Sequence, residues 1–206
     1  MSVLKKPTII TISRQYGSGG KEIANKLGEL LGIPVYDREI ISLAAKQSGT
    51  DEYAFEQLDS GMSSPMYSLA MLDVHNANDQ LFIAQSQAIR QLAEKGSCIF
   101  IGRCADYVLR DFDDVYNIFI TSNSLQKVEH IKKRGLFHRK NADGWLQEIA
   151  DMEHRRRTYY EHYTGRIWGD AAHYDLCIDS SKTGPATADA ILAFIKLSQQ
   201  VLDDVQ

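Results

Sequence analysis

Residues 8–27 read TIITISRQYGSGGKEIANKL, and this stretch decides the fold class of the chain. Residues 8–12 are apolar and β-branched, which is typical of a buried strand. A turn with three glycines follows, and residues 21–31 carry an apolar stripe at helical spacing. A strand, a tight glycine turn and a helix in this order indicate the opening unit of an α/β domain.

The glycine turn also has the features of an anion-binding loop. Glycines let the backbone turn tightly and point successive N–H groups inward. The following helix adds unpaired N–H groups and the positive end of its dipole. Lys21 stands first in that helix, where its charge could reach the β- and γ-phosphates of a nucleotide. We therefore predict a phosphate-binding loop that comprises Gly17, Ser18, Gly19, Gly20 and Lys21.

The loop departs from the usual pattern G-x-x-x-x-G-K-[ST] at two positions. Gln15 stands where the first glycine is expected, and Glu22 replaces the hydroxyl residue that normally binds Mg²⁺. The Glu22 carboxylate either takes the metal itself or stabilises the N-terminus of the helix. A glycine-rich turn that binds no ligand is the alternative, but the strand–turn–helix context favours the phosphate loop, with Glu22 as the candidate Mg²⁺ ligand.

The rest of the chain alternates short apolar runs with helical segments. Runs at residues 33–36, 98–101, 115–120 and 174–178 predict four further strands. Several of them lack strict alternation, which suits strands that are covered on both faces. Helical stripes lie at residues 79–95 and near the C-terminus. Strands joined by crossover helices indicate a mainly parallel α/β sheet.

The length of 206 residues suits a single domain, residues 1–206. We expect its core to comprise residues 1–47, 79–131 and 167–206. The polar segment at about 48–78 is interpreted as an insertion between core elements. The segment at about 132–166 holds nine Lys or Arg among 35 residues and has a helical middle, so we expect it to form a basic flap.

Composition restricts the class of protein. The formal charge is −4, whereas binding to phosphate backbones favours a basic surface, so nucleic acid is not the expected partner. No stretch approaches the roughly 20 apolar residues of a membrane helix, and no membrane partner is expected. The three cysteines are far apart and match neither a zinc cluster nor a disulfide framework. These features predict a cytoplasmic protein, and they do not fix its oligomeric state.

Several segments resemble the cytidylate kinase-like family, which is related to nucleoside monophosphate kinases. They are residues 12–23, 36–41, 99–106, 156–165, 168–169 and 174–182. The resemblance covers nearly the whole chain in order. It implies a three-layer P-loop nucleoside-kinase fold with a mainly five-stranded parallel sheet and a helical lid. It also implies ATP as the phosphoryl donor with Mg²⁺, and small-molecule nucleotides as partners.

The resemblance further assigns roles to individual residues. On the donor side it places the ATP phosphates at Gly17 to Lys21 and the donor base near Asp179, Ser180 and Ser181. On the acceptor side it places the acceptor phosphate at Arg38 and Arg103. The basic flap becomes a lid, with candidates for the transferring group at Arg155, Arg156 and Arg157. Cytidylate kinases carry Asp directly after the arginine of the Gly-Arg pair, whereas this chain has Cys104, and Asp106 is the nearest substitute.

The two acceptor-side arginines also have structural interpretations. Arg103 follows an apolar run, so it should emerge at the carboxyl end of a strand, where open α/β sheets bind ligands. It could instead pair with Asp106 or Asp111. Arg38 could form a surface ion pair with its neighbour Asp37, and such pairs contribute little. Asp37 itself is a candidate acceptor-side or metal-orienting carboxylate.

Three consecutive arginines in the flap cannot all face one phosphate, because they spread over about 200° of a helix. We favour Arg156, since Glu153 lies three residues earlier and could brace it. A solvated basic face is the alternative.

The predicted function is transfer of the γ-phosphoryl group of ATP to a nucleoside monophosphate, with CMP and dCMP as the leading acceptors. Lys21, Arg103 and Arg156 are the predicted catalytic residues. A nucleotide-binding sensor without turnover is the rival, because Gln15, Glu22 and Cys104 each depart from a catalytic pattern. A kinase for another small acceptor is a further alternative.

Overall fold

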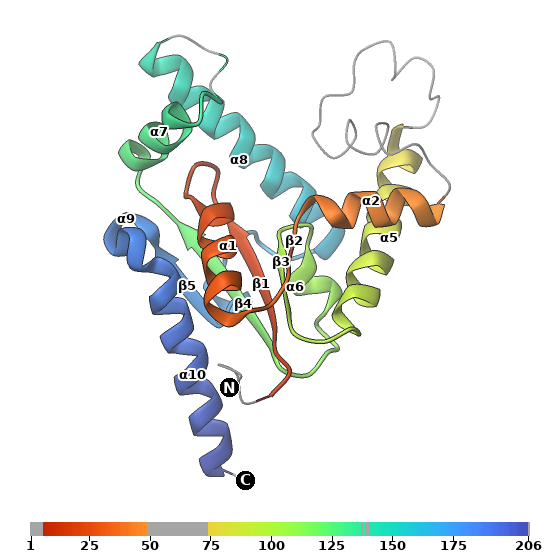
Figure 1. The fold of residues 1–206 in the computed structure, drawn as a ribbon. Coiled ribbons are helices and arrows are strands. Elements are labelled where there is room, and N and C mark those ends of the chain that lie inside the picture. The colour runs from red at the N-terminus through yellow and green to blue at the C-terminus, as the bar shows by residue number, and fades with distance from the viewer. Residues whose placement is uncertain (1–5, 49–73, 137, 139–140, 206) are drawn as a thin grey trace.

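The computed structural model describes residues 6–48, 74–136, 138 and 141–205 (Figure 1). Within these residues, five parallel strands form one sheet in the order β2-β3-β1-β4-β5. The strands are β1 Ile9–Arg14, β2 Val35–Tyr36, β3 Cys98–Ile101, β4 Val115–Thr121 and β5 Leu176–Asp179. The mainly parallel sheet expected from the sequence is confirmed.

Strand β1 is the centre of the sheet, because it pairs with β3 on one side and β4 on the other. Ile10, for example, lies opposite Ile99 of β3 and Tyr116 of β4. The first five residues of β1 are buried, as expected for a strand covered on both faces. Because all strands are parallel, their carboxyl ends meet at one edge, and the glycine loop leaves β1 there.

Helices cover both faces of the sheet and make three layers. On one face, Leu27 and Ile191 from two helices pack against Ile10 and Ile118. On the other face, side chains such as Ile89 pack against Phe100. The α-helices are α1 Gly20–Leu31, α2 Arg38–Ser48, α5 Val74–Ala93, α6 Ala105–Val108, α7 Ser124–Lys133, α8 Ala142–Thr164, α9 Ser180–Thr183 and α10 Thr187–Val205. Two 3₁₀ helices, η1 Ala171–His173 and η2 Gly184–Ala186, flank β5.

Two boundaries differ from the sequence-based expectation. Helix α5 begins at Val74, inside the segment interpreted as an insertion, and residues 49–73 of that segment lie outside the described residues. The arm that projects beside the sheet in Figure 1 consists of α7 and α8, and α7 starts at Ser124, before the expected start of the flap. The Asn123 side chain accepts a hydrogen bond from the Gln126 N–H and so caps α7.

The second half of α8 packs against α5. The Phe82 and Tyr163 rings are stacked with centroids 4.2 Å apart, and Tyr159 meets both rings edge-on. These tyrosines therefore attach the arm to the body of the protein. No helix in the described ranges combines the length and apolar character needed to cross a bilayer.

Truncation of side chains on the two faces of α10 should change the free energy of unfolding by very different amounts. Ile191 is fully buried against the sheet, whereas Leu197 is 61% exposed on the same helix. We expect Ile191→Ala to lower the free energy of unfolding by about 2–5 kcal/mol, and Leu197→Ala to change it by about 0.5 kcal/mol at most. Urea unfolding of both variants measures this. Equal effects would contradict the assigned packing of α10.

Candidate active site

The loop between β1 and α1 has a conformation that requires glycine. Gly17 and Gly19 have φ values of 79° and 76°, in the left-handed region that favours glycine. A Cβ at Gly17 would lie 2.8 Å from Cδ1 of Ile131, and a Cβ at Gly20 would lie 2.7 Å from Cγ of Arg14. The loop is thus both tightly turned and closely packed, and it leads directly into α1, as predicted for a phosphate loop.

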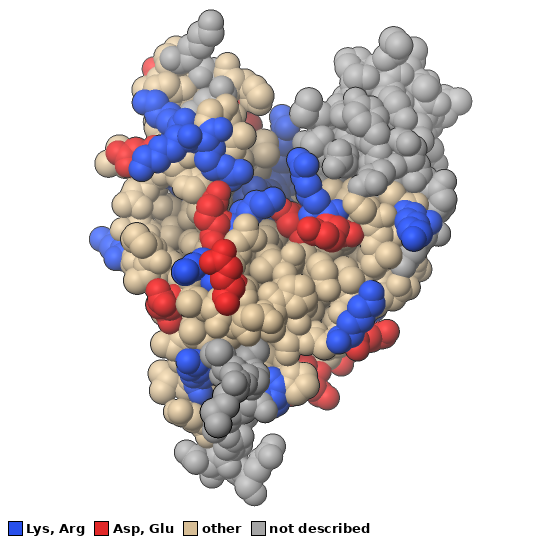
Figure 2. Space-filling view, in the orientation of Figure 1, with Lys and Arg blue, Asp and Glu red and all other residues tan. Residues whose placement is uncertain are grey.

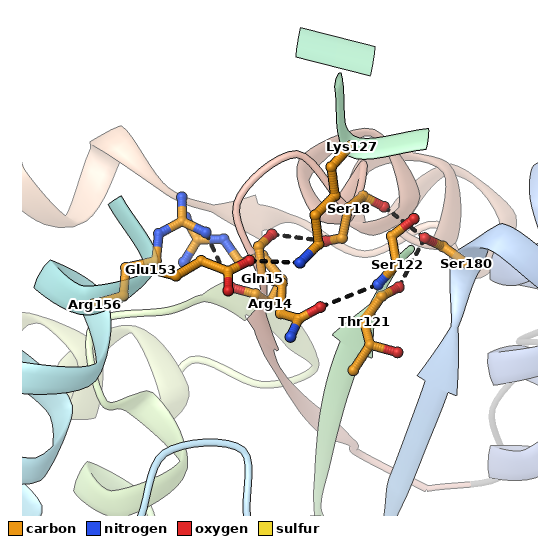
Figure 3. Close-up of polar contacts among 9 residues, drawn as sticks. All are labelled: Arg14, Gln15, Ser18, Thr121, Ser122, Lys127, Glu153, Arg156 and Ser180. Carbon is orange, nitrogen blue, oxygen red and sulfur yellow. Dashed lines mark hydrogen bonds and ion pairs between the residues drawn. The ribbon is translucent and has the colours of Figure 1, made fainter. Parts of the chain in front are cut away.

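Polar side chains fasten this loop to the neighbouring strand ends (Figure 3). The Ser18 hydroxyl donates to the Gln15 carbonyl at 2.9 Å, and Oε1 of Gln15 accepts from the Ser122 N–H at 3.2 Å. The Ser180 hydroxyl lies 2.9 Å from the carbonyls of both Ser18 and Thr121. Gln15, which departs from the usual motif, therefore ties the loop to the segment after β4.

Lys21 and Arg103 converge on one carboxylate. Nζ of Lys21 lies 2.7 Å from Oδ2 of Asp37, and Nη2 of Arg103 lies 3.6 Å from Oδ1 of the same side chain. Nε of Arg103 also donates to the Asp37 carbonyl at 3.2 Å. The structure thus brings together the predicted donor lysine, the predicted acceptor arginine and Asp37. Arg103 does not pair with Asp106 or Asp111, the alternatives that the sequence left open.

Burial opposes ionisation of Asp37, but its cationic neighbours prevail. The hydrogen bond from Lys21 and the charges of Arg103, Lys21 and Arg14 hold the pKa of Asp37 below its ordinary value despite the desolvation. Asp37 is therefore a carboxylate at neutral pH. Two cations held around a single carboxylate form a site where a phosphate group would also be stabilised.

A left-handed turn presents Arg103 at the end of β3. Gly102, Arg103 and Cys104 have φ values of 69°, 57° and 55°. The left-handed conformation costs a non-glycine residue about 1–2 kcal/mol, and such strain concentrates at functional sites. A Cβ at Gly102 would collide with the guanidinium of Arg14, so a larger residue there would displace this side chain.

Arg156 reaches the same region from α8. Its Nη1 donates to the Arg14 carbonyl at 3.0 Å, and its guanidinium lies over the Tyr16 ring, 5.4 Å from the centroid. Burial lowers the pKa of Arg156. Arg155 and Arg157 are exposed on other sides of the helix. Of the three arginines, the structure brings Arg156 to the loop.

A buried ion pair that the sequence did not reveal links α7 to α8 behind the loop. Nζ of Lys127 lies 2.6 Å from Oε1 of Glu153, and the Lys127 side chain is 8% exposed (Figure 3). Glu153, expected to brace Arg156, makes this shorter contact instead, although its charge still favours protonated Arg156. A signal was present in the sequence, since Lys127 lies four residues before the apolar Ile131 on the same helix face.

Glu22 lies beside the loop and faces basic residues of α7. Its Oε1 is 3.1 Å from Nη1 of Arg134, and its Oε2 is 3.5 Å from Nε2 of His130. Among the described residues, no group of three or more His, Cys, Asp or Glu could hold a metal by itself. A metal role for Glu22 stays a prediction.

A pocket of about 330 Å³ adjoins the loop. It lies between α1, α7 and the segment after β5. Its lining residues include Gly17, Gly19, Gln126, His130, Ser180 and Pro185. Asp179 lies next to this pocket in sequence, and its Oδ1 accepts from the Ser181 N–H and hydroxyl. These hydrogen bonds hold the pKa of Asp179 below its ordinary value.

Of the residues predicted to bind the acceptor, Asp106 is buried and Arg38 is exposed. Asp106 is 2% exposed and accepts a hydrogen bond from the Tyr160 hydroxyl, so it does not face the cluster around Asp37. Arg38 is exposed at the start of α2. Cys104 is buried, and this burial, with the nearby charge of Asp106, raises the pKa of its thiol.

Basic side chains gather around the hollow beside the α7–α8 arm, as Figure 2 shows. Acidic side chains lie next to them, so cations and carboxylates alternate over the loop and the strand ends. The site therefore combines a glycine loop, a lysine–carboxylate–arginine cluster and a third cation from α8. This arrangement suits neutralisation of several phosphate groups held close together.

The lowered pKa of Asp37 predicts a pH dependence of stability. Because the folded-state pKa lies below the ordinary 3.8, the stabilising effect is complete above that pH and is lost as the pH falls through the folded value. We expect Asp37→Asn to lower the free energy of unfolding by about 1–2 kcal/mol above pH 5, and this difference to shrink towards pH 2.5. Urea unfolding across that range measures it. A difference that does not vary with pH would contradict the assigned ion pairs.

Comparison with known proteins identifies the family and the fold. The model of the cytidylate kinase-like family matches residues 9–182. A cytidylate kinase from Pyrococcus horikoshii is 25% identical over 202 residues, which cover 98% of this chain and 93% of the relative. The structure of an uncharacterized protein from Eubacterium ventriosum is 26% identical, with a TM-score of 0.68 over 92% of this chain and 98% of that chain.

A more distant structure shows the fold alone. The shikimate kinase from Bacteroides thetaiotaomicron is 9% identical, with a TM-score of 0.56 over 95% of this chain and 98% of that chain. The three-layer P-loop kinase fold that the family resemblance implied is therefore confirmed. The chain belongs to the cytidylate kinase-like family and is a phosphotransferase built on the P-loop kinase fold.

Proposed function

We propose that this protein transfers the γ-phosphoryl group of ATP to a nucleoside monophosphate, with CMP and dCMP as its acceptors. The observation that carries the proposal is the convergence of Lys21 and Arg103 on Asp37. Lys21 belongs to the donor loop and Arg103 to a different strand end, so two phosphate-binding cations meet at one point. The relatives named cytidylate kinase support cytidine nucleotides as the acceptor class.

The donor nucleotide occupies the loop and the adjoining pocket in this proposal. The N–H groups of residues 17–21 and the Lys21 ammonium hold the β- and γ-phosphates. The base and ribose then extend into the pocket beside Ser180, with Asp179 near its rim. A pocket of about 330 Å³ suits part of a nucleotide.

The acceptor occupies the other side of Asp37. The guanidinium of Arg103 binds the acceptor phosphate, and the exposed Arg38 side chain adds a second cation. Asp37 holds Lys21 and Arg103 in place until phosphates arrive. It needs no general-base role, because the attacking phosphate oxygen is already ionised at neutral pH.

Transfer itself depends on charge neutralisation and positioning. Arg156 stabilises the negative charge on the transferring group, and the α7–α8 arm excludes water that would otherwise accept the phosphoryl. The arm is attached to α5 by stacked aromatic rings, and at its other end His130 of α7 and the following Arg134 face Glu22 beside the loop.

Mg²⁺ fits this site only as a partner of the nucleotide. In phosphoryl-transfer sites, Mg²⁺ keeps several waters, binds substrate phosphates and takes one or two protein carboxylates. Asp37 lies next to the donor lysine, and Glu22 lies beside the loop, so these two carboxylates are the proposed ligands. When bound with ATP, the ion supplies positive charge to the β- and γ-phosphates.

The proposal is tested by measuring ADP formation from Mg²⁺–ATP with CMP, dCMP, UMP, AMP or no acceptor. We expect acceptor-dependent turnover with the cytidine nucleotides. Lys21→Ala should lower this turnover at least about 100-fold, because one cation on developing charge contributes this much. Lys196→Ala, which removes an exposed lysine of α10, should leave it unchanged.

Other outcomes identify the alternatives. ATP binding without ADP formation under any acceptor would support a sensor. Turnover with a small acceptor outside the nucleotides would place the protein among other kinases of this fold. Unchanged turnover and ATP affinity in Lys21→Ala would refute the donor site.

The three arginines of α8 provide a matched comparison. Arg156 contacts the loop, whereas its neighbour Arg157 is exposed. We expect Arg156→Ala to lower kcat about 100-fold, and Arg157→Ala to leave kcat within about twofold. Steady-state kinetics with saturating ATP and acceptor measure both. Equal losses would favour a diffuse basic face over a specific role for Arg156.

A further inference from the structure

One buried hydrogen bond connects α6, the helix that follows β3, to α8, the helix that carries Arg156. The Tyr160 hydroxyl of α8 donates to Oδ2 of Asp106 in α6 at 2.6 Å. Asp106 is 2% exposed and Tyr160 is 3% exposed. Around the bond lies an apolar cluster that includes Cys104, Phe119 and Trp168. Water therefore has little access to replace this bond if it is lost.

The Tyr160 hydroxyl is the donor of this bond and the Asp106 carboxyl is the acceptor. Burial and the neighbouring Asp106 charge raise the pKa of Tyr160 far above its ordinary value. Burial also raises the pKa of Asp106, while the hydrogen bond from Tyr160 acts against that rise. The backbone N–H groups of Asp106 and Tyr107 also donate to this carboxyl, and Tyr160 is its side-chain donor. Loss of a donor to a group buried this deeply is costly.

The tyrosine end of the bond controls the direction of Arg156. Tyr160 lies four residues after Arg156, so both side chains project from the same face of α8. Anchoring Tyr160 therefore fixes the rotation of α8 about its axis. At that rotation, Arg156 points to the Arg14 carbonyl, while Arg155 and Arg157 point elsewhere.

The aspartate end of the bond supports the turn that presents Arg103. Asp106 is the second residue of α6, and the left-handed residues Arg103 and Cys104 come just before that helix. Such a turn persists only where the surroundings hold it. The hydrogen bond attaches the residue just beyond this turn to a long helix.

We propose that Asp106 and Tyr160 form a positioning pair that aligns Arg156 with the phosphate loop and stabilises the turn carrying Arg103. The pair touches no substrate and acts through the two arginines. The proposal rests on the proposed function, because it assigns a task to residues of that same site. Asp106, predicted from the sequence to bind the acceptor directly, thus acts behind the site.

The test compares two tyrosines of α8 that each donate to a carboxylate. Tyr160→Phe removes the buried bond to Asp106, and Tyr163→Phe removes an exposed bond of 3.1 Å to Asp79. With Mg²⁺–ATP and CMP, we expect Tyr160→Phe to lower kcat at least tenfold while the KM for ATP stays within threefold. Tyr163→Phe should keep kcat within twofold. All assays are run at temperatures where circular dichroism shows each variant fully folded.

Variants of the aspartate separate positioning from a general loss of packing. Asp106→Asn keeps an oxygen that accepts from Tyr160, so we expect kcat within threefold of the wild type. Asp106→Leu removes the acceptor and should match Tyr160→Phe, and the double variant should lose no more than either single variant. Additive losses would overturn the pair. So would a wild-type kcat in Tyr160→Phe.

A binding measurement distinguishes failure of this proposal from failure of the proposed function. If the wild type transfers no phosphoryl group to any acceptor, the proposed function fails. The ratio of the ATP and ADP affinities, measured by calorimetry, still reports whether Arg156 reaches the γ-phosphate. We expect Tyr160→Phe and Arg156→Ala to reduce this ratio by the same factor, at least threefold. A Tyr160→Phe ratio equal to that of the wild type would overturn the positioning role.

Discussion

The carboxylate of Asp37 is the interaction on which the site depends, because it holds Lys21 and Arg103 in one place. Two unit charges about 4 Å apart interact by about 4 kcal/mol at the dielectric of a protein surface, so two cations without an anion between them would repel strongly. Ionisation of Asp37 prevails over its desolvation for this reason, and its pKa is lowered. Phosphate groups carry the same sign of charge and can take over the same partners when they bind.

The remaining parts of the site hold the donor loop in a fixed position relative to this cluster. Gln15 and Ser180 fasten the loop to the ends of β4 and β5, and the Lys127–Glu153 pair joins the two helices of the arm behind it. Lys21 of the loop and Arg156 of α8 both lie close enough to Asp37 to feel its charge. The molecule combines a donor loop fixed by hydrogen bonds with a helical arm that lies over it, which suits a reaction that excludes water.

Sequence patterns predicted the sheet, the glycine loop and most helices, because burial on both faces and helical periodicity leave clear signals. They placed the start of the basic flap at about residue 132 and did not predict that α7 begins at Ser124, since this helix is short and its asparagine cap is a weaker signal than its basic residues. The convergence of Lys21, Asp37 and Arg103 depends on strand order, and the role of Asp106 depends on burial. Neither quantity can be obtained from residue spacing alone.

The most direct test is a crystal structure of the protein with a non-hydrolysable ATP analogue and CMP. We expect Nζ of Lys21 to leave Asp37 for the donor phosphates, and Arg103 to bind the phosphate of CMP, with Arg156 between the two nucleotides. Donor phosphates bound away from residues 17–21, or an intact Lys21–Asp37 pair with Arg103 turned away from CMP, would contradict the assignment of both phosphate sites.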